Sequence, residues 1–205
     1  MNAKDGLKEM IEMSIADEMP VEACVFTGEE ITGMICEKVE FINVTFNNCR
    51  ILYCDFTKSY FDRVVFNNCD LSNCNFSQSF WKECELTDGK AQGVKFTDSV
   101  LRKCRIMNNK LDYASFQQAA LEDTVLENCS FLSAFLSEMK FKRVSFINDR
   151  FESTDFFKTS FKGIDLSTCE LVQPLLSESL WEIKGAKLST LQAVEVAKLV
   201  GIIVV

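Results

Sequence analysis

Large apolar residues recur at every fifth position from Phe26 to Trp181, and no insertion breaks this register. The 32 positions hold 15 Phe, 10 Leu, 3 Ile, 2 Trp and two small residues, Cys36 and Ala91. A helix of about 3.6 residues per turn would spread such a series around its whole surface, and a long strand has a period of two. Short extended steps separated by turns fit the spacing. The pattern therefore predicts a winding coil with the large residues inside.

Small residues lie two positions before these large ones, and nine of the ten cysteines are among them. Disulfide-dense domains are usually short and secreted, whereas this chain of 205 residues opens with "MNAKDGLKEMIEM", which has no apolar leader segment. We therefore expect a cytoplasmic location. Zinc ligands cluster at Cys-x-x-Cys spacing, which is absent here, and the chain has no His. The sequence predicts buried free thiols, no metal site and no cofactor.

The repeat unit is a small residue, then often Asp or Asn, then Leu or Phe, then often Ser or Thr, then any residue. "CDFTK" at residues 54–58 and "CDLSN" at residues 69–73 show it. The motif resembles the pentapeptide-repeat proteins over residues 24–183. The resemblance implies an all-β, right-handed quadrilateral β-helix of about eight coils with four pentapeptides per coil. The period alone leaves a three-sided coil equally open.

The segments outside the repeats are expected to close the two ends of this solenoid, because bare ends would pair with other chains. Residues 1–23 predict an N-terminal cap with a helix over residues 5–16, where Leu7, Met10, Ile11 and Ile15 have near-helical spacing and Pro20 follows. Residues 184–205 predict a helix from Leu191 to Val200, with Ser189 as N-cap and Gly201 as its stop, followed by a short strand.

A rod without inserted loops that ends in an apolar helix resembles the Qnr and mycobacterial fluoroquinolone-resistance branch of the family. The resemblance implies a homodimer that imitates duplex DNA, binds DNA gyrase and topoisomerase IV, and can protect them from fluoroquinolones. The absence of inserted loops leaves loop-dependent protection open. The alternative is a pentapeptide-repeat scaffold with another, unknown partner. The expected dimer interface consists of Leu191, Val194, Leu199, Val200, Ile202 and Val204.

The net charge of −8, from 30 acidic and 22 basic residues, disfavours binding to nucleic acid and suits a DNA imitator. If four repeats make a coil, the faces centred on Phe26, Ile31 and Cys36 carry net charges of −3, −3 and −2, and the face centred on Phe41 carries +2. An acidic partner-binding surface is expected near the dimer junction, on Asp149, Glu152, Asp155, Asp165, Glu170 and Glu178.

Other functions find little support in the sequence. The chain has no His and no Gly-rich phosphate loop, and the outward residues of a solenoid are not expected to form a cleft. The sequence therefore predicts neither an enzyme nor a site for a small-molecule substrate. The apolar tail is too short to span a membrane. One coil is irregular, because "TDGKAQG" at residues 87–93 places Gly89 at the small position and Ala91 at the large one. A kink, or a shifted side chain such as Phe80, is expected to fill this coil.

Overall fold

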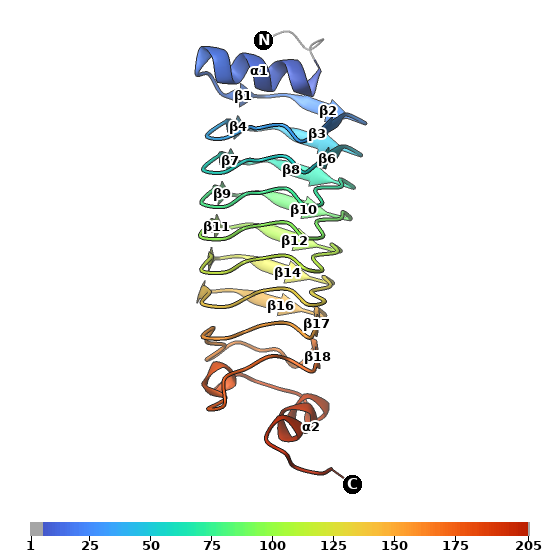
Figure 1. Cartoon of the computed structure of the whole chain (residues 1–205), viewed down its shortest axis with the longest axis vertical. Coiled ribbons are helices and arrows are strands. Elements are labelled where there is room, and N and C mark those ends of the chain that lie inside the picture. The colour runs from blue at the N-terminus through green and yellow to red at the C-terminus, as the bar shows by residue number, and fades with distance from the viewer. Residues whose placement is uncertain (1–5, 205) are drawn as a thin grey trace.

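The structure, a computed structural model that describes residues 6–204, is a parallel β-solenoid with a helix at each end (Figure 1). Helix α1 (Leu7–Asp17) covers the first coil, and helix α2 (Thr190–Leu199) lies beyond the last one. A short 3-10 helix, η1 (Trp181–Ile183), precedes α2. No helix in the described part of the chain is long and apolar enough to cross a membrane.

Two of the four sides of the rod are seven-stranded parallel sheets. The first sheet contains β1 (Val21–Glu22), β4 (Glu40–Ile42), β7 (Tyr60–Asp62), β9 (Phe80–Lys82), β11 (Val100–Arg102), β13 (Ala120–Glu122) and β15 (Lys140–Lys142). The second sheet contains β2 (Val25–Thr27), β5 (Thr45–Asn47), β8 (Val65–Asn67), β10 (Glu85–Thr87), β12 (Arg105–Met107), β14 (Val125–Glu127) and β16 (Ser145–Ile147).

The other two sides pair more sparsely. The side that follows the second sheet contains two two-stranded sheets, β3 (Glu30–Thr32) with β6 (Arg50–Leu52), and β17 (Arg150–Glu152) with β18 (Glu170–Val172). The remaining side is the one centred on Cys36; it is called the third face because it follows the faces centred on Phe26 and Ile31 along the chain. This face is held by single bridges such as Phe135 to Asp155 and Asp155 to Leu175. Paired residues in the regular coils are twenty positions apart, so each coil contains four pentapeptides. This confirms the expected pentapeptide-repeat β-helix.

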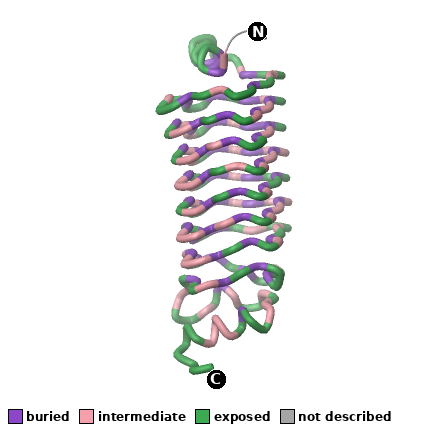
Figure 2. The backbone as a smooth tube through the Cα atoms, turned by 90° about the vertical axis from the view of Figure 1, so that its right-hand side faces the viewer, coloured by how far each residue is buried: buried purple, intermediate pink, exposed green. Residues whose placement is uncertain are grey.

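The large residues form columns of stacked side chains inside the rod, as expected. The ring centroids of Phe41 and Phe61 are 5.2 Å apart, and those of Phe61 and Trp81 are 4.2 Å apart. Figure 2 shows the regular alternation of buried and exposed positions along each coil. The fifth residue of most repeats forms the corner in the left-handed region, for example Asn43 at φ 54°. Its N–H donates to a carbonyl of the next coil, which makes each corner part of the ladder.

The C-terminal end departs from the register. The inward position expected for Trp181 is wrong, because this side chain is 39% exposed and the neighbouring Glu182 is buried instead. The Glu182 carboxylate accepts hydrogen bonds from the N–H groups of Lys158 and Ser177, at 3.1 and 3.3 Å. The next bridge joins Asp165 to Lys187, a spacing of 22 residues. The turn that contains η1 therefore adds two residues to this coil, which a fixed period cannot predict.

The two helices match their sequence signals, and two expectations at the ends of the chain are wrong. Ser189 and Gln192 form a capping box on α2, and Gly201 follows at φ 81°. No strand forms at residues 202–204, where the chain has no neighbouring strand to pair with. In α1, Leu7, Met10 and Ile11 are buried but Ile15 is exposed, because the helix turns that side away from the coil.

Gly89 fits its coil without a kink, since Lys90 bridges both Asp70 and Lys110. A Cβ at Gly89 would lie 2.6 Å from the carbonyl oxygen of Cys69, so the close approach of two coils requires glycine there. The expectation that Phe80 fills this coil is wrong. Phe80 stacks on Tyr60 with ring centroids 5.7 Å apart, and both rings lie on the outer side of the first sheet.

Candidate protein-interaction surfaces

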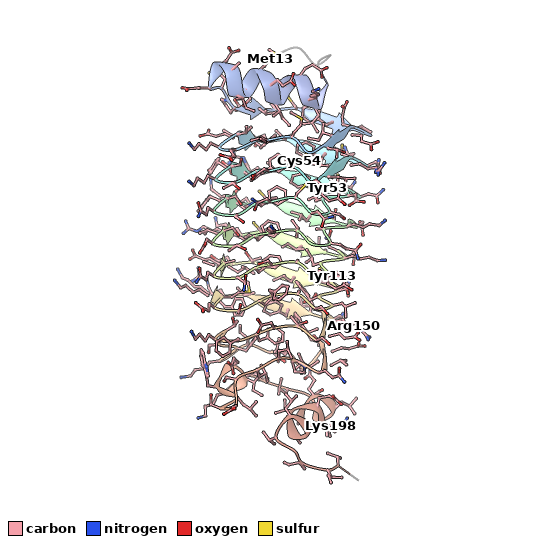
Figure 3. All side chains as sticks on the ribbon, viewed as in Figure 1. Met13, Tyr53, Cys54, Tyr113, Arg150 and Lys198 are labelled. Atoms are coloured by element: carbon pink, nitrogen blue, oxygen red, sulfur yellow. The ribbon has the colours of Figure 1, made fainter. Side chains whose placement is uncertain are left out.

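The acidic residues expected to bind a partner lie mostly at the surface of the last coils. Asp165, Glu170 and Glu178 are exposed, and Glu152 and Asp155 are half-buried. Arg150 is placed between two of them, with a nitrogen 2.8 Å from Glu152 and another 2.6 Å from Glu170 (labelled in Figure 3). Lys187 lies 3.7 Å from Asp165. The negative charge of this surface is therefore partly neutralised by its own basic residues.

Asp149 is a correction to the expected surface, because its side chain is fully buried and cannot contact a partner. It occupies the small inward position that cysteine fills in neighbouring coils. Its carboxylate accepts hydrogen bonds from the N–H groups of Cys129 and Ile147, at 2.8 and 3.1 Å. Burial in this apolar column raises the pKa of Asp149 to about 7. Its position in the five-residue register was the signal that could have placed it inside.

The strongest concentration of negative charge lies at the other end of the rod, which the sequence reasoning missed. Residues 6–47 contain two basic residues, Lys8 and Lys38, and nine acidic ones, a net charge of −7. The acidic residues are Glu9, Glu12, Asp17, Glu18, Glu22, Glu29, Glu30, Glu37 and Glu40. A count of charge along the chain, rather than around the faces, would have revealed it.

The first sheet carries the basic face, and several of its basic residues pair with acidic residues of adjacent coils. Lys82 lies 3.5 Å from Asp62 of the previous coil, and Lys103 lies 3.1 Å from Glu83. Glu122 contacts Arg102, Lys142 and Arg143 at once. The neighbouring cations hold the pKa values of Glu83 and Glu122 below the usual range. Most acidic side chains of this face are therefore paired with basic side chains of the rod, and little of their negative charge is available to a partner.

The C-terminal tail is largely exposed (Figure 2), and many of its exposed residues are apolar. Leu191 and Ile203 are 80% and 87% exposed. The expected interface residues Leu199, Val200, Ile202 and Val204 are exposed as well, whereas Val194 is half-buried. Gln192 anchors the helix, because its Nε2 donates to the carbonyls of Leu166 and Cys169 at 2.6 Å each. The helix is therefore fixed on the last coil with much of its apolar surface uncovered.

The cysteines line the inside of the coils as free thiols. All ten are unpaired; nine are buried and Cys24 is half-buried. Many donate to backbone carbonyls, such as Cys74 to Ile51 at 3.0 Å. Burial raises the pKa of the Cys36 and Cys129 thiols to about 12. Within residues 6–204, no group of three or more His, Cys, Asp or Glu side chains is arranged to hold a metal ion.

Comparison with known families finds the same repeat. A family model described as a pentapeptide repeat region matches residues 21–96 and 39–116. A second, described as pentapeptide repeats in eight copies, matches residues 110–147. No curated protein matches the sequence significantly.

Solved structures with the same fold include two forms of QnrB1, a plasmid-mediated fluoroquinolone resistance protein. A trypsin-treated form is 22% identical, with a TM-score of 0.52 over 91% of this chain and 100% of that chain. The full-length form is 17% identical, with a TM-score of 0.45 over 87% and 100%. HetL from the cyanobacterium Nostoc sp. strain PCC 7120, involved in heterocyst differentiation regulation, is 10% identical, with a TM-score of 0.36 over 91% and 98%. At such identities the similarity concerns the fold alone.

Proposed function

Because this chain belongs to the pentapeptide-repeat family, whose two models together match residues 21–147, we propose that it is an interaction protein that imitates duplex DNA. Two rods join through their C-terminal tails, and the dimer binds a type II topoisomerase, DNA gyrase or topoisomerase IV. This function requires a cytoplasmic location. The fold shared with QnrB1 supports the proposal, and the uncovered tail of this chain is the observation that carries it.

The tail supports a dimer because a helix with apolar residues on its outward side is unfavourable in water. Leu191 and Leu199 face away from the rod while Gln192 holds α2 in place. A second copy of the same patch would cover these side chains around a two-fold axis, as isologous interfaces do. Val194 is half-buried and therefore contributes less exposed apolar surface to this interface than expected.

The shape and charge of the rod support DNA imitation. The coils follow one another without inserted loops, so the sides of the rod are continuous (Figure 1). Acidic residues recur on the second sheet and on the side that follows it, and the basic face is separate from them. Five acidic residues are proposed to bind the topoisomerase. Asp155 and Glu178 form no ion pair within residues 6–204, whereas Glu152, Asp165 and Glu170 each contact a basic residue.

A supercoiling assay with purified DNA gyrase tests this function. The protein should inhibit supercoiling or restore it in the presence of a quinolone, and the double variant Asp165→Lys with Glu170→Lys should weaken the effect at physiological salt. A matched control reverses Asp98 and Glu138, which are exposed corners of the third face, and should act like the wild type. If the wild type changes neither reaction, the topoisomerase proposal is wrong and the rod serves another partner.

A further inference from the structure

The N-terminal end of the rod contains a groove that residues 6–204 leave unfilled. It lies between the end of α1 and the corner of the second coil at residues 37–40, and its volume is about 410 Å³. Its apolar lining comes from Ile15, Met19, Pro20 and Val39. The groove exists because residues 17–20 leave the helix instead of forming a complete coil above residues 37–40. Figure 3 shows this end of α1 beside the labelled Met13.

The apolar side chains at this groove are only partly covered. Ile15 lies in the last turn of α1 and Met19 lies just beyond the end of the helix, and they are 47% and 57% exposed. Met13, on the same helix, is also exposed. Unbranched methionine adapts to partners of different shape, which is why exposed methionines favour binding surfaces. Solvation of this surface is unfavourable, and a partner side chain in the groove would remove it from water.

The groove is surrounded by unneutralised negative charge. Glu18, Glu37 and Glu40 line it, with Lys38 as the single basic residue among the lining groups. None of these three glutamates forms an ion pair within residues 6–204. In contrast, Asp62 and Glu122, further along the rod, contact lysine residues of neighbouring coils. Residues 6–47, which form this end of the rod, carry a net charge of −7. The resulting negative potential attracts positively charged partners.

We propose that this groove binds a basic amphipathic segment of a partner protein, with an apolar side chain on Ile15 and Met19 and Lys or Arg side chains beside Glu18, Glu37 and Glu40. Charge complementarity selects this occupant. Nucleic acid and anionic lipid surfaces are repelled by the same glutamates. A small hydrophilic cation would leave the apolar lining exposed. The groove lies at the end of the rod opposite the tail, so the proposal does not depend on the topoisomerase or on the dimer.

The probe for this site is a fluorescent synthetic peptide built of alternating lysine and leucine pairs. Fluorescence anisotropy at low salt should show saturable binding to the full-length protein. Glu18→Lys with Glu37→Lys should weaken the affinity about tenfold, since rim charges act mainly on association. Met19→Ser should weaken it as well, with a smaller change in salt dependence. The control pair Asp98→Lys with Glu138→Lys removes the same charge from the third face and should bind the peptide like the wild type.

Two further measurements separate a groove from diffuse attraction. An oligolysine of equal charge should bind more weakly than the lysine–leucine peptide, because it has no apolar side chain for the groove. The methyl NMR resonance of Met19, which lines the groove, should shift on addition of the peptide, while those of Met107 and Met139, far along the rod, should not. Equal binding of both peptides, or equal weakening by the control pair, would overturn the proposal.

Discussion

Asn109 and Asp149 occupy the same inward position two coils apart, and each accepts a hydrogen bond from the N–H group twenty residues earlier. The Asn109 Oδ1 lies 3.2 Å from the nitrogen of Gly89, and the Asp149 Oδ1 lies 2.8 Å from that of Cys129. The Asn109 Nδ2 also donates to the carbonyls of Leu86 and Met107, at 2.9 and 2.7 Å. An ionised Asp149 has no proton for its equivalent carbonyls. The coil therefore favours a neutral side chain at this position.

Asp149→Asn should make the protein more stable at alkaline pH. Burial raises the pKa of Asp149 from 3.8 to about 7 in the folded state, so the wild type loses stability as the pH rises from about 4 to about 7. The asparagine variant has no such loss and should be more stable at pH 8 by on the order of 4 kcal/mol. Denaturant unfolding of both proteins at pH 4 and pH 8 measures the difference.

The reverse exchange provides the control for this prediction. Asn109→Asp should introduce a second buried carboxyl, so its stability should fall more steeply with rising pH than that of the wild type. If the gap between Asp149→Asn and the wild type is the same at pH 4 and pH 8, the ionisation of Asp149 is not what limits stability.

Phe116→Ala should destabilise the middle of the rod. The ring is 1% exposed and stacks on Phe96 with centroids 4.9 Å apart, so its removal leaves a cavity in a continuous column. We expect a loss of about 3 to 5 kcal/mol in the free energy of unfolding. The control Phe157→Ala removes a ring that is 45% exposed on the third face and should cost about 0.5 kcal/mol. Similar losses for the two variants would contradict the assigned inward column.

The sequence predicts the regular part of this fold well because one rule repeats. Each large residue of the five-residue series, from Phe26 to Leu171, lies next to the corresponding residue of the adjacent coil. The period alone therefore predicts which residues are buried, and the one exception in this range is the half-buried Phe141. The rule fails where the chain leaves it. Two added residues near η1 turn Trp181 outward and bury Glu182, and nothing in a five-residue pattern encodes such an insertion.

The interaction surfaces were harder to predict than the core, because charge acts through neighbours that lie twenty residues away. Arg150 reduces the charge of Glu152 and Glu170, and this becomes visible only once the coils are stacked. Asp149 was assigned to the surface by its residue type, although its register places it inside. The groove beside Met19 depends on where α1 ends, and helix ends are the least certain part of any sequence interpretation.

Thiol labelling should count ten free cysteines in the denatured protein and about one in the native protein. Nine side chains are buried and therefore inaccessible to the reagent, and burial raises the pKa of the Cys36 and Cys129 thiols, which keeps their reactive thiolates scarce. Cys24 is half-buried and should react first. The serine variant Cys24→Ser should remove this fast phase. Stoichiometric zinc, or disulfides in freshly reduced protein, would contradict the interpretation of these residues as packing groups.

Leu191→Asp with Leu199→Arg should convert a dimer into a folded monomer. Both side chains are exposed on α2, so the charges do not disturb the coils, whereas a change at the half-buried Val194 would also loosen the helix. The far-ultraviolet circular dichroism should stay rich in β structure. Light scattering should show half the wild-type mass, and binding to gyrase should weaken because a single rod offers half of the duplex-like surface. The control Ile35→Asp changes an equally uncovered residue, 71% exposed, far from the tail and should remain dimeric. A tail variant with the same mass as the wild type would show that these side chains do not join two rods, because two desolvated charges at the centre of an apolar interface are not tolerated.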